Sequence, residues 1–394
     1  MSAFFTYIEN RLEDLRSKDL FRQIRTLDSL PAPTVSDGKR ELINFSSNDY
    51  LGLANSDDLK EAAKAAIDEY GAGAGSARLI CGTQRIHTDL EEALAEFKGT
   101  EAALAFNTGY ATAAGCITAL LSRKDVLIID KLVHACIVDA ARQAGCHLRV
   151  YRHNDLNDLE KKLQWANKKH PDARTLIATE SVFSMDGDIA PLLNIVELKE
   201  NYGAWLMVDE AHGTGLFGEH RRGVIEEYKL SDRVEIQMAT LGKAIGASGG
   251  AICGSRSLID LLINHARSFI YSTAPTPASV AAAKKGVEIL QGTEGEKRRQ
   301  RLWAMVDNLK NTFIDSGQSP GIVRSPIVPL ICGSSESALS RSEQLYDSGI
   351  LVPAIRYPTV ARNQARLRFT ITADHTLDHL AQLEAALSTP EDDE

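Results

Sequence analysis

Short apolar runs alternate along the middle of the chain with stretches in which apolar residues recur at helical spacing. A short run rich in β-branched residues predicts a buried strand, and an i, i+3, i+4 pattern predicts a helix with one packed face. The predicted strands are 102–106, 126–129, 148–151, 175–179, 204–208, 236–239 and 250–253, and the helical patterns between them include 88–97, 155–167 and 192–201. This alternation predicts an α/β fold, a mainly parallel sheet covered on both faces by helices.

The pattern changes near Pro277. A long helical pattern over 281–291 is followed by strand-like runs at 327–331, 350–356 and 366–372 and by a last helix over 377–387. This order predicts a smaller α+β domain. We therefore expect an N-terminal helix and arm over 1–48, a ligand-binding large domain over 49–280 and a small C-terminal domain over 281–394, whose last residues, 390–394, are expected to fray.

The N-terminal segment predicts an amphipathic helix that docks on the body of the protein, because Phe4, Ile8, Leu12 and Leu15 share one helical face. Charged residues come too early in it for a secretory signal. The apolar stretch 102–121 is interrupted by glycines and polar residues, so it is too polar to span a bilayer. We expect a soluble, cytoplasmic protein.

Charge and cysteine usage narrow the classes of partner and site. The 394 residues carry a net charge of -9 with no basic block, which argues against nucleic acid and anionic membranes as partners. The six cysteines lie far apart and form no C-x-x-C pair. They are better explained as buried free thiols in a reducing cytoplasm than as disulfides or zinc ligands, so no metal is expected.

Two residues at predicted strand ends carry the most specific chemistry. Lys243 follows the strand 236–239, and Asp209 follows the strand 204–208. A lysine at the dry end of a strand loses its charge more easily and can then form an imine with a carbonyl cofactor. An aspartate nearby would keep a pyridine nitrogen protonated, and the two together are typical of pyridoxal 5'-phosphate (PLP) enzymes. Either residue alone is more simply a surface lysine or a strand-end cap.

Further candidates surround this pair, because ligands of such sheets bind beyond the carboxyl ends of the strands. Glu180 also falls at a strand end. Gly109 and Tyr110 begin a helical pattern after the strand 102–106, a position at which backbone amides can bind a phosphate. The hydroxyls of Thr240 and Thr273 are available in the same region, and Ser184 is expected at the rim of the crevice.

Two histidines complete this set of candidates. His134 follows the strand 126–129, and His212 lies three residues after Asp209. A lone strand-end histidine is more often structural, but beside a planar cofactor it could stack on the ring.

Four segments resemble those of the α-oxoamine synthases, and the resemblance extends over nearly the whole chain: 45–53, 180–188, 208–215 and 240–244. The resemblance implies a fold-type I PLP-dependent transferase that condenses an amino acid with an acyl-CoA and releases carbon dioxide. It also implies a homodimer with the site at the interface.

The resemblance implies a role for each matching residue. Lys243 would carry the Schiff base, Asp209 would pair with the pyridine nitrogen, His134 would stack on the ring and His212 would bond the phenolic oxygen. The other matches are Gly109, Tyr110 and Thr240 around the phosphate, and Asn48, Ser76, Ser184 and Arg368 at the substrates. We also expect Ser184 and Thr273 to bind cofactor and Arg356 to bind substrate.

The family members differ in their substrates. Segments 354–360 and 365–373 are most similar to members that join L-alanine to pimeloyl-CoA in biotin biosynthesis, although Tyr357 stands where those members usually have proline. Segment 76–84 is closer to members that use glycine and acetyl-CoA. We expect the first reaction; glycine with acetyl-CoA, or a longer acyl chain, is the alternative.

Other classes of protein fit less well. Residues 209–212 spell a helicase box, but that box works with a phosphate loop G-x-x-x-x-G-K-[ST], a string that the sequence does not contain. A non-catalytic binding protein of the same fold is disfavoured because Lys243, Asp209, His134 and His212 are all present. An aminotransferase of the same fold stays open, and its independence of CoA would distinguish it.

Overall fold

The computed structural model describes residues 2–388, which form two compact units. Within the described residues, unit 1 comprises 2–47, Met185–Gly187 and 301–388, and unit 2 comprises Asn48–Ser184 and Asp188–Gln300. This division differs from the expected domain boundaries at 281–300. Those residues belong to unit 2 because the helix α11 (Pro277–Gln291) packs on α2 (Asp57–Tyr70) and α3 (Arg85–Lys98).

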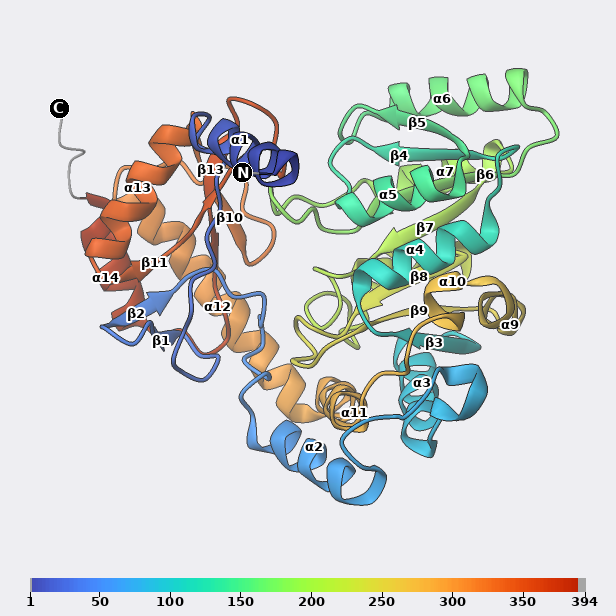
Figure 1. Ribbon diagram of the computed structural model, residues 1–394, viewed down its shortest axis with the longest axis horizontal. Coiled ribbons are helices and arrows are strands. Elements are labelled where there is room, and N and C mark those ends of the chain that lie inside the picture. Colours follow the sequence, from blue (N-terminus) through green and yellow to red (C-terminus); the bar gives the residue numbers. More distant parts are fainter. Residues whose placement is uncertain (1, 389–394) are drawn as a thin grey trace. The chain divides into compact units, whose positions relative to one another are not determined.

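Unit 2 is built on a seven-stranded sheet whose order is β3-β9-β8-β7-β6-β4-β5 (Figure 1). All seven predicted strands are present within one or two residues of their expected bounds, which confirms the α/β class. The strands are β3 (Ala102–Phe106), β4 (Val126–Asp130), β5 (His147–Tyr151), β6 (Thr175–Glu180), β7 (Trp205–Asp209), β8 (Ile236–Thr240) and β9 (Gly250–Gly254).

The strands β8, β7, β6, β4 and β5 run parallel, whereas β9 is antiparallel to both of its neighbours. The reversed direction of β9 follows from the short link that precedes it. A parallel crossover needs about a dozen residues or more, and the link 241–249 between β8 and β9 is shorter. The carboxyl ends of the parallel strands therefore share one edge, and this short link follows β8 there.

Helices connect these strands, as the sequence pattern predicts. They include α4 (Gly109–Leu120), α5 (Ala135–Ala144), α6 (Leu156–Lys169), α7 (Leu192–Asn201), α8 (Val224–Glu227), α9 (Arg256–His265) and α10 (Arg267–Ile270), with the single turns η1 (Arg78–Gly82) and η2 (Ser231–Arg233). The core strands are buried along their whole length, as in a sheet covered on both faces. The helix α12 (Thr293–Asp315) begins in unit 2 and ends in unit 1.

Unit 1 is an α+β arrangement of two three-stranded sheets, β1-β2-β11 and β10-β13-β12. The N-terminal arm joins the C-terminal residues here because β2 pairs with β11. The elements are β1 (Thr34–Ser36), β2 (Glu41–Asn44), β10 (Ile327–Gly333), α13 (Ser335–Asp347), β11 (Ile350–Leu351), β12 (Ala354–Ile355), β13 (Ala365–Thr370) and α14 (Leu377–Ser388). The expected fraying of 390–394 lies outside the described residues.

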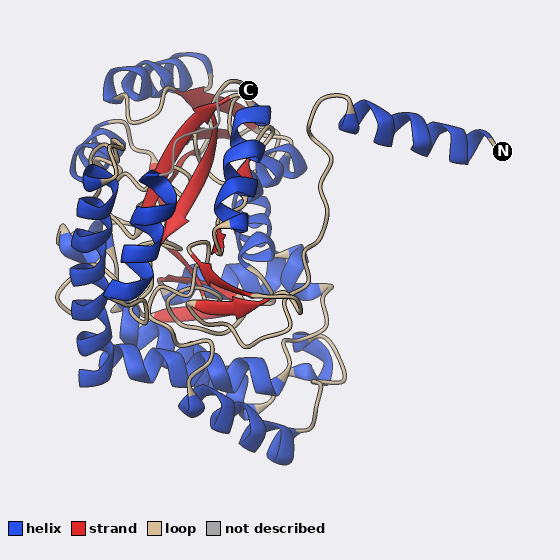
Figure 2. Ribbon diagram, turned by 90° about the vertical axis from the view of Figure 1, so that its left-hand side faces the viewer, coloured by secondary structure: helices blue, strands red, loops and turns tan. Residues whose placement is uncertain are grey.

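The N-terminal helix α1 (Ala3–Arg16) forms as predicted, but it does not dock. None of its residues is buried, and Phe4, Phe5 and Tyr7 are more than half exposed. Figure 2 shows the helix standing apart from the rest of its unit. The docking prediction was wrong for the single chain, because the other described residues do not cover the apolar face of α1.

The prediction of buried free thiols holds for three of the six cysteines. Cys116, Cys136 and Cys253 are buried thiols, and burial raises the pKa of each, whereas Cys146 and Cys332 are partly buried and Cys81 is exposed. Within residues 2–388, none of the helices combines the length and the apolar character needed to cross a membrane.

Candidate active site

Lys243 lies in the link after β8 and is hydrogen-bonded to His212. Its Nζ is 2.8 Å from Nε2 of His212, and the other ring nitrogen, Nδ1, is 2.6 Å from the hydroxyl of Tyr50. That hydroxyl is also 3.3 Å from Oδ1 of Asn48. Four side chains from three separate segments of unit 2 thus form one chain of hydrogen bonds, and Lys243, His212 and Asn48 are all candidates from the sequence.

Asp209 and Glu180 end adjacent strands. They are paired in the register of β7 and β6, and both side chains are buried. Burial, followed by the nearby Asp209 carboxylate, raises the pKa of Glu180 to about 8. Burial also raises the pKa of Asp209, while the charge of Lys243 works against that rise. The edge of the sheet therefore favours a positive group beside these two carboxylates.

Glu180 connects two of the candidate residues through their backbones. Its Oε1 accepts a hydrogen bond from the amide of His134 at 2.5 Å, and its Oε2 accepts one from the amide of Ser184 at 3.1 Å. His134 is solvent-exposed in the single chain and caps α5, with Nδ1 accepting from the amide of Cys136. Ser184 is buried, not at the rim as expected, because Glu180 holds its amide inside the unit.

The N-terminus of α4 forms a second part of the site. The hydroxyl of Thr108 accepts from the amide of Ala111, which leaves the amides of Gly109 and Tyr110 at the open end of the helix. A Cβ at Gly109 would lie 2.9 Å from Cγ2 of Thr240, so only glycine allows this close approach. The buried Oγ1 of Thr240 has no hydrogen-bond partner in the described protein.

Side chains and backbone beside α4 connect two further candidates. The amide group of Asn107 donates to Oγ of Ser272 and to the carbonyl of Thr273, each at 2.8 Å. The carbonyl of Ser76 accepts from the amide of Ala274 at 3.0 Å. Ser76 therefore lies close to Thr273, because its carbonyl bonds the amide of the next residue, Ala274.

The two candidate arginines lie in unit 1. Arg368 is buried on β13, opposite Pro329 of β10. Arg356 follows β12, and its guanidinium donates to the carbonyls of Asp19 and Phe21, the latter at 3.2 Å. Arg356 thereby holds the segment that follows α1.

The sequence analysis missed Tyr50 and Asn107 and gave Glu180 no role. Tyr50 was inside a segment noted for its family resemblance, but nothing local indicated a partner 162 residues away. For Glu180, the available signal was its position at the end of a buried strand next to Asp209.

The turn that carries Ser184 is anchored by His153. Its Nδ1 is 2.9 Å from Asp130 and its Nε2 is 2.8 Å from Asp188. Burial opposes the charged form, but the hydrogen bonds to Asp130 and Asp188 outweigh it and raise the pKa of His153 to about 10. The ring of Phe183 packs edge-on against His153 at 4.4 Å. The charged His153 therefore links Asp130, at the end of β4, to Asp188, which follows the turn that carries Ser184.

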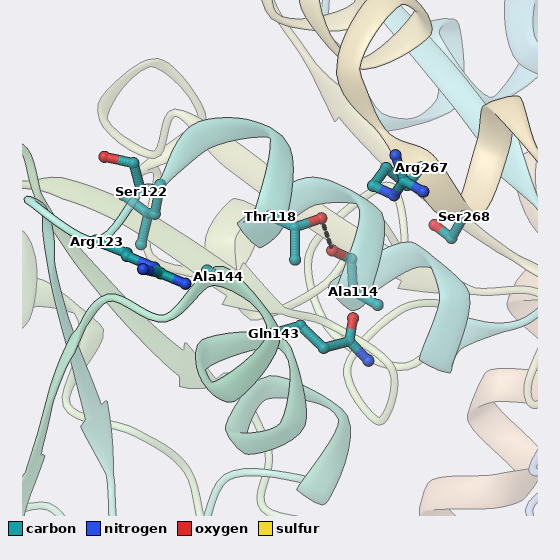
Figure 3. A pocket seen from close by; sticks show the side chains of 9 residues that line it. Ala114, Thr118, Ser122, Arg123, Gln143, Ala144, Arg267 and Ser268 are labelled. Carbon is teal, nitrogen blue, oxygen red and sulfur yellow. Dashed lines mark hydrogen bonds between the residues drawn. The ribbon is translucent and has the colours of Figure 1, made fainter.

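A cavity of about 610 Å³ lies elsewhere in unit 2, between α4, α5 and α10. Figure 3 shows Arg123, Gln143 and Arg267 around it, with Thr118 bonded to the carbonyl of Ala114. None of the candidate site residues lines this cavity.

Known proteins match both the chain and its fold. A model of the family described as "Aminotransferase class I and II" matches residues 40–387, and the chain therefore belongs to this family. An 8-amino-7-oxononanoate synthase of Geobacter sulfurreducens is 43% identical over 382 residues, which cover 97% of each chain.

Solved structures give the same result. Serine palmitoyltransferase of Sphingomonas wittichii superposes with a TM-score of 0.90 at 30% identity, over 98% of this chain and 96% of that chain. An 8-amino-7-oxononanoate synthase from Francisella tularensis superposes with a TM-score of 0.75 at 28% identity, over 88% and 97%. A structure titled as SPT with PLP is 30% identical, with a TM-score of 0.90. The expected fold-type I PLP-transferase class is confirmed.

The His153 network predicts a pH-dependent contribution to stability. Because the pKa of His153 is higher in the folded protein, its charged form stabilises the fold fully below the ordinary pKa of 6.5. That stabilisation is lost as the pH rises through about 10. Wild type should exceed His153→Gln in free energy of unfolding by about 2 kcal/mol at the acidic end, as hydrogen bonds to charged groups are worth roughly this much. Urea titrations across this window should show the difference shrinking. A constant difference would mean that folding does not shift the pKa of His153.

Proposed function

We propose that this protein catalyses the PLP-dependent condensation of L-alanine with pimeloyl-CoA, giving 8-amino-7-oxononanoate, CoA and carbon dioxide, a step of biotin biosynthesis. The observation that carries the proposal is the contact of Lys243 with His212 beside Asp209, in a chain 43% identical to a synthase of this name over 97% of its length. The reaction class is an acyl transfer by a PLP enzyme.

The residues present fit the cofactor. The unpartnered Oγ1 of Thr240 and the open amides of Gly109 and Tyr110 converge where only glycine permits close approach, a suitable environment for a phosphate at a helix N-terminus. Ser184 and Thr273 are proposed as further cofactor contacts. Asp209 would pair with the ring nitrogen, His134 would stack on the ring and His212 would bond the phenolic oxygen.

Bound PLP supplies an electron sink for the electron pair left on the amino-acid Cα. Asp209 makes that sink effective, because its buried negative charge holds a proton on the ring nitrogen. Glu180 keeps the loops of His134 and Ser184 in place through two backbone hydrogen bonds. Burial of Glu180 and Asp209 excludes water from this end of the sheet.

Lys243 is proposed to have a second role, as the general base that removes the proton from Cα of alanine. Without cofactor, Nζ lies 2.8 Å from Nε2 of His212, so the lysine amine is already on the side of the site where His212 would bond the phenolic oxygen. The new bond joins Cα of alanine to the thioester carbonyl carbon of pimeloyl-CoA, and the C–S bond breaks to release CoA. Loss of the original carboxylate as carbon dioxide then leaves the amino ketone, and a proton returns to Cα.

The remaining residues are proposed to hold the substrates. Arg368 would bind the amino-acid carboxylate, and fixing that group orients the Cα–H bond for removal. Asn48 and Ser184 would contact the condensing groups, and Ser76 would lie near the entry of the acyl chain. We assign Arg356 a supporting role at the far carboxylate of the pimeloyl group.

The alternative of glycine with acetyl-CoA rested on the segment 76–84. Arg78 in that segment makes two 2.9 Å hydrogen bonds to Glu91 and a third bond, from Nε, to Thr83. A structural ion pair thus accounts for this part of the segment, and no substrate preference is needed to explain it.

The proposed working form is a cytoplasmic homodimer. His134, Tyr110 and Thr273 are exposed in the single chain although they are proposed to bind cofactor, and Ile80 and Tyr271 nearby are more than 70% exposed. A second copy covering this face would enclose these groups. The buried thiols Cys116, Cys136 and Cys253 suit a reducing compartment.

CoA release tests the proposed reaction directly. With PLP present, we expect thiol release from pimeloyl-CoA to depend on L-alanine and to be faster than with glycine or serine. Acyl-CoAs of other lengths should react more slowly. A preference for glycine with acetyl-CoA would favour the alternative synthase, and transamination without CoA would indicate an aminotransferase.

Lys243 should be the residue that binds the cofactor covalently. The purified protein should be yellow, and borohydride followed by peptide mapping should find the pyridoxyl group on Lys243. Lys243→Ala should retain PLP through the phosphate contacts but turn over at least a thousandfold more slowly, about 4 kcal/mol of transition-state stabilisation. Labelling of a different lysine would reject the assignment.

Arg356 should affect charged acyl chains selectively. A charge-assisted hydrogen bond contributes roughly 1.5–3 kcal/mol, so Arg356→Ala should lower kcat/KM for pimeloyl-CoA by about ten- to a hundredfold relative to an uncharged chain of similar length. Arg22→Ala is the matched control, because Arg22 bonds the carbonyl of Tyr357 in the same region at 3.2 Å. If both variants lose kcat/KM equally for the charged and the uncharged acyl chain, Arg356 only holds residues 19–21 in place.

A further inference from the structure

Tyr50 lies directly behind His212 in unit 2. Its side chain is fully buried, and its hydroxyl oxygen is 2.6 Å from Nδ1 of His212. The rings are tilted at 60° with centroids 5.9 Å apart, so the hydroxyl and not the ring face meets the imidazole. Nε2, on the other side of that imidazole, faces Lys243 at 2.8 Å.

The hydrogen on the tyrosine hydroxyl decides which ring nitrogen of His212 carries a proton. A neutral imidazole has one nitrogen that donates and one that accepts. The Tyr50 hydroxyl oxygen is 2.6 Å from Nδ1 of His212 and 3.3 Å from Oδ1 of Asn48. The first distance is that of a strong hydrogen bond and the second that of a weak one. When Nε2 faces an acceptor, the imidazole hydrogen is on Nε2, and the Tyr50 hydroxyl is then the donor to Nδ1.

We propose that Tyr50 is a positioning residue that holds His212 in the Nε2–H tautomer. Nε2 is then a hydrogen-bond donor toward the phenolic oxygen of PLP when the cofactor is bound. Without cofactor, the charged amine of Lys243 can only donate, and Nε2 accepts from it at 2.8 Å. This inference rests on the PLP site proposed above, but it does not depend on the identity of the amino acid or the acyl-CoA.

The tautomer has a measurable consequence. A hydrogen bond donated by His212 disperses the negative charge of the phenolic oxygen. That oxygen then stabilises a proton on the neighbouring Lys243 nitrogen less strongly, and the pKa of this nitrogen is lower. Without Tyr50, His212 is free to adopt the other tautomer and the donor is lost. The charged groups that face this region, Asp209 and Glu180, are the same in each variant compared below, so their effects cancel.

The experiment is a pH titration of the visible absorption band of the PLP-loaded protein, without substrates. Tyr50→Phe keeps the buried ring and removes only the hydroxyl. The pH at the midpoint of this titration should be higher in Tyr50→Phe than in wild type by about half a pH unit to one pH unit. This shift is equivalent to one hydrogen bond of about 1 kcal/mol. An unchanged midpoint in a protein that still binds PLP would overturn the proposal.

Two controls test whether the effect passes through His212. Tyr151→Phe removes a buried hydroxyl from β5 of the same unit and should leave the midpoint unchanged. In a His212→Asn background, Tyr50→Phe should add no further shift, because the two changes act on one interaction. The same shift in that background would mean that Tyr50 acts by another route, which contradicts the proposal.

A measurement on the wild type covers the case in which Tyr50→Phe does not fold. Nitrogen-15 NMR of the PLP-loaded protein labelled at its ten histidines identifies His212 by the signals that disappear in His212→Asn. We expect a protonated Nε2 and an unprotonated Nδ1; the reverse would overturn the proposal. Absence of CoA release together with the expected midpoint shift would reject the synthase reaction alone, and CoA release without a shift would reject the tautomer alone.

Discussion

The burial of two carboxylates at adjacent strand ends is the constraint around which the site is organised. Glu180 and Asp209 face each other across the register of β6 and β7, and burial raises the pKa of both. Buried carboxylates cost free energy unless donors or positive charges surround them. The structure supplies backbone amides of His134 and Ser184 to the first, the amide of Ala211 to the second, and the charge of Lys243 nearby.

The same arrangement explains why the site suits a cationic ring. A pyridinium nitrogen bonded to Asp209 would neutralise a charge that the apoprotein must otherwise carry in a dry environment. Cofactor binding and the stability of this edge of the sheet are therefore coupled. His153, charged between Asp130 and Asp188, stabilises the turn next to Glu180 in a comparable way, with a cation balancing two acids.

Several features of the single chain would be explained by the second copy proposed above. The helix α1 presents Phe4, Phe5 and Tyr7 to solvent, and His134 is exposed although it belongs to the proposed site. Exposed apolar residues of this number on one helix are typical of an interaction surface. They suit the proposed homodimer better than an isolated monomer.

The sequence by itself determined the seven strands of the large sheet and predicted most residues of the candidate site, because buried parallel strands are apolar runs and ligand-binding residues follow their ends. Lys243, Asp209 and Gly109 are recognisable from such local signals. Other features depend on contacts between distant residues, on which local patterns carry no information. The direction of β9, the exposure of α1 and the bond from Tyr50 to His212, 162 residues along the chain, were decided only when the tertiary structure brought those segments together.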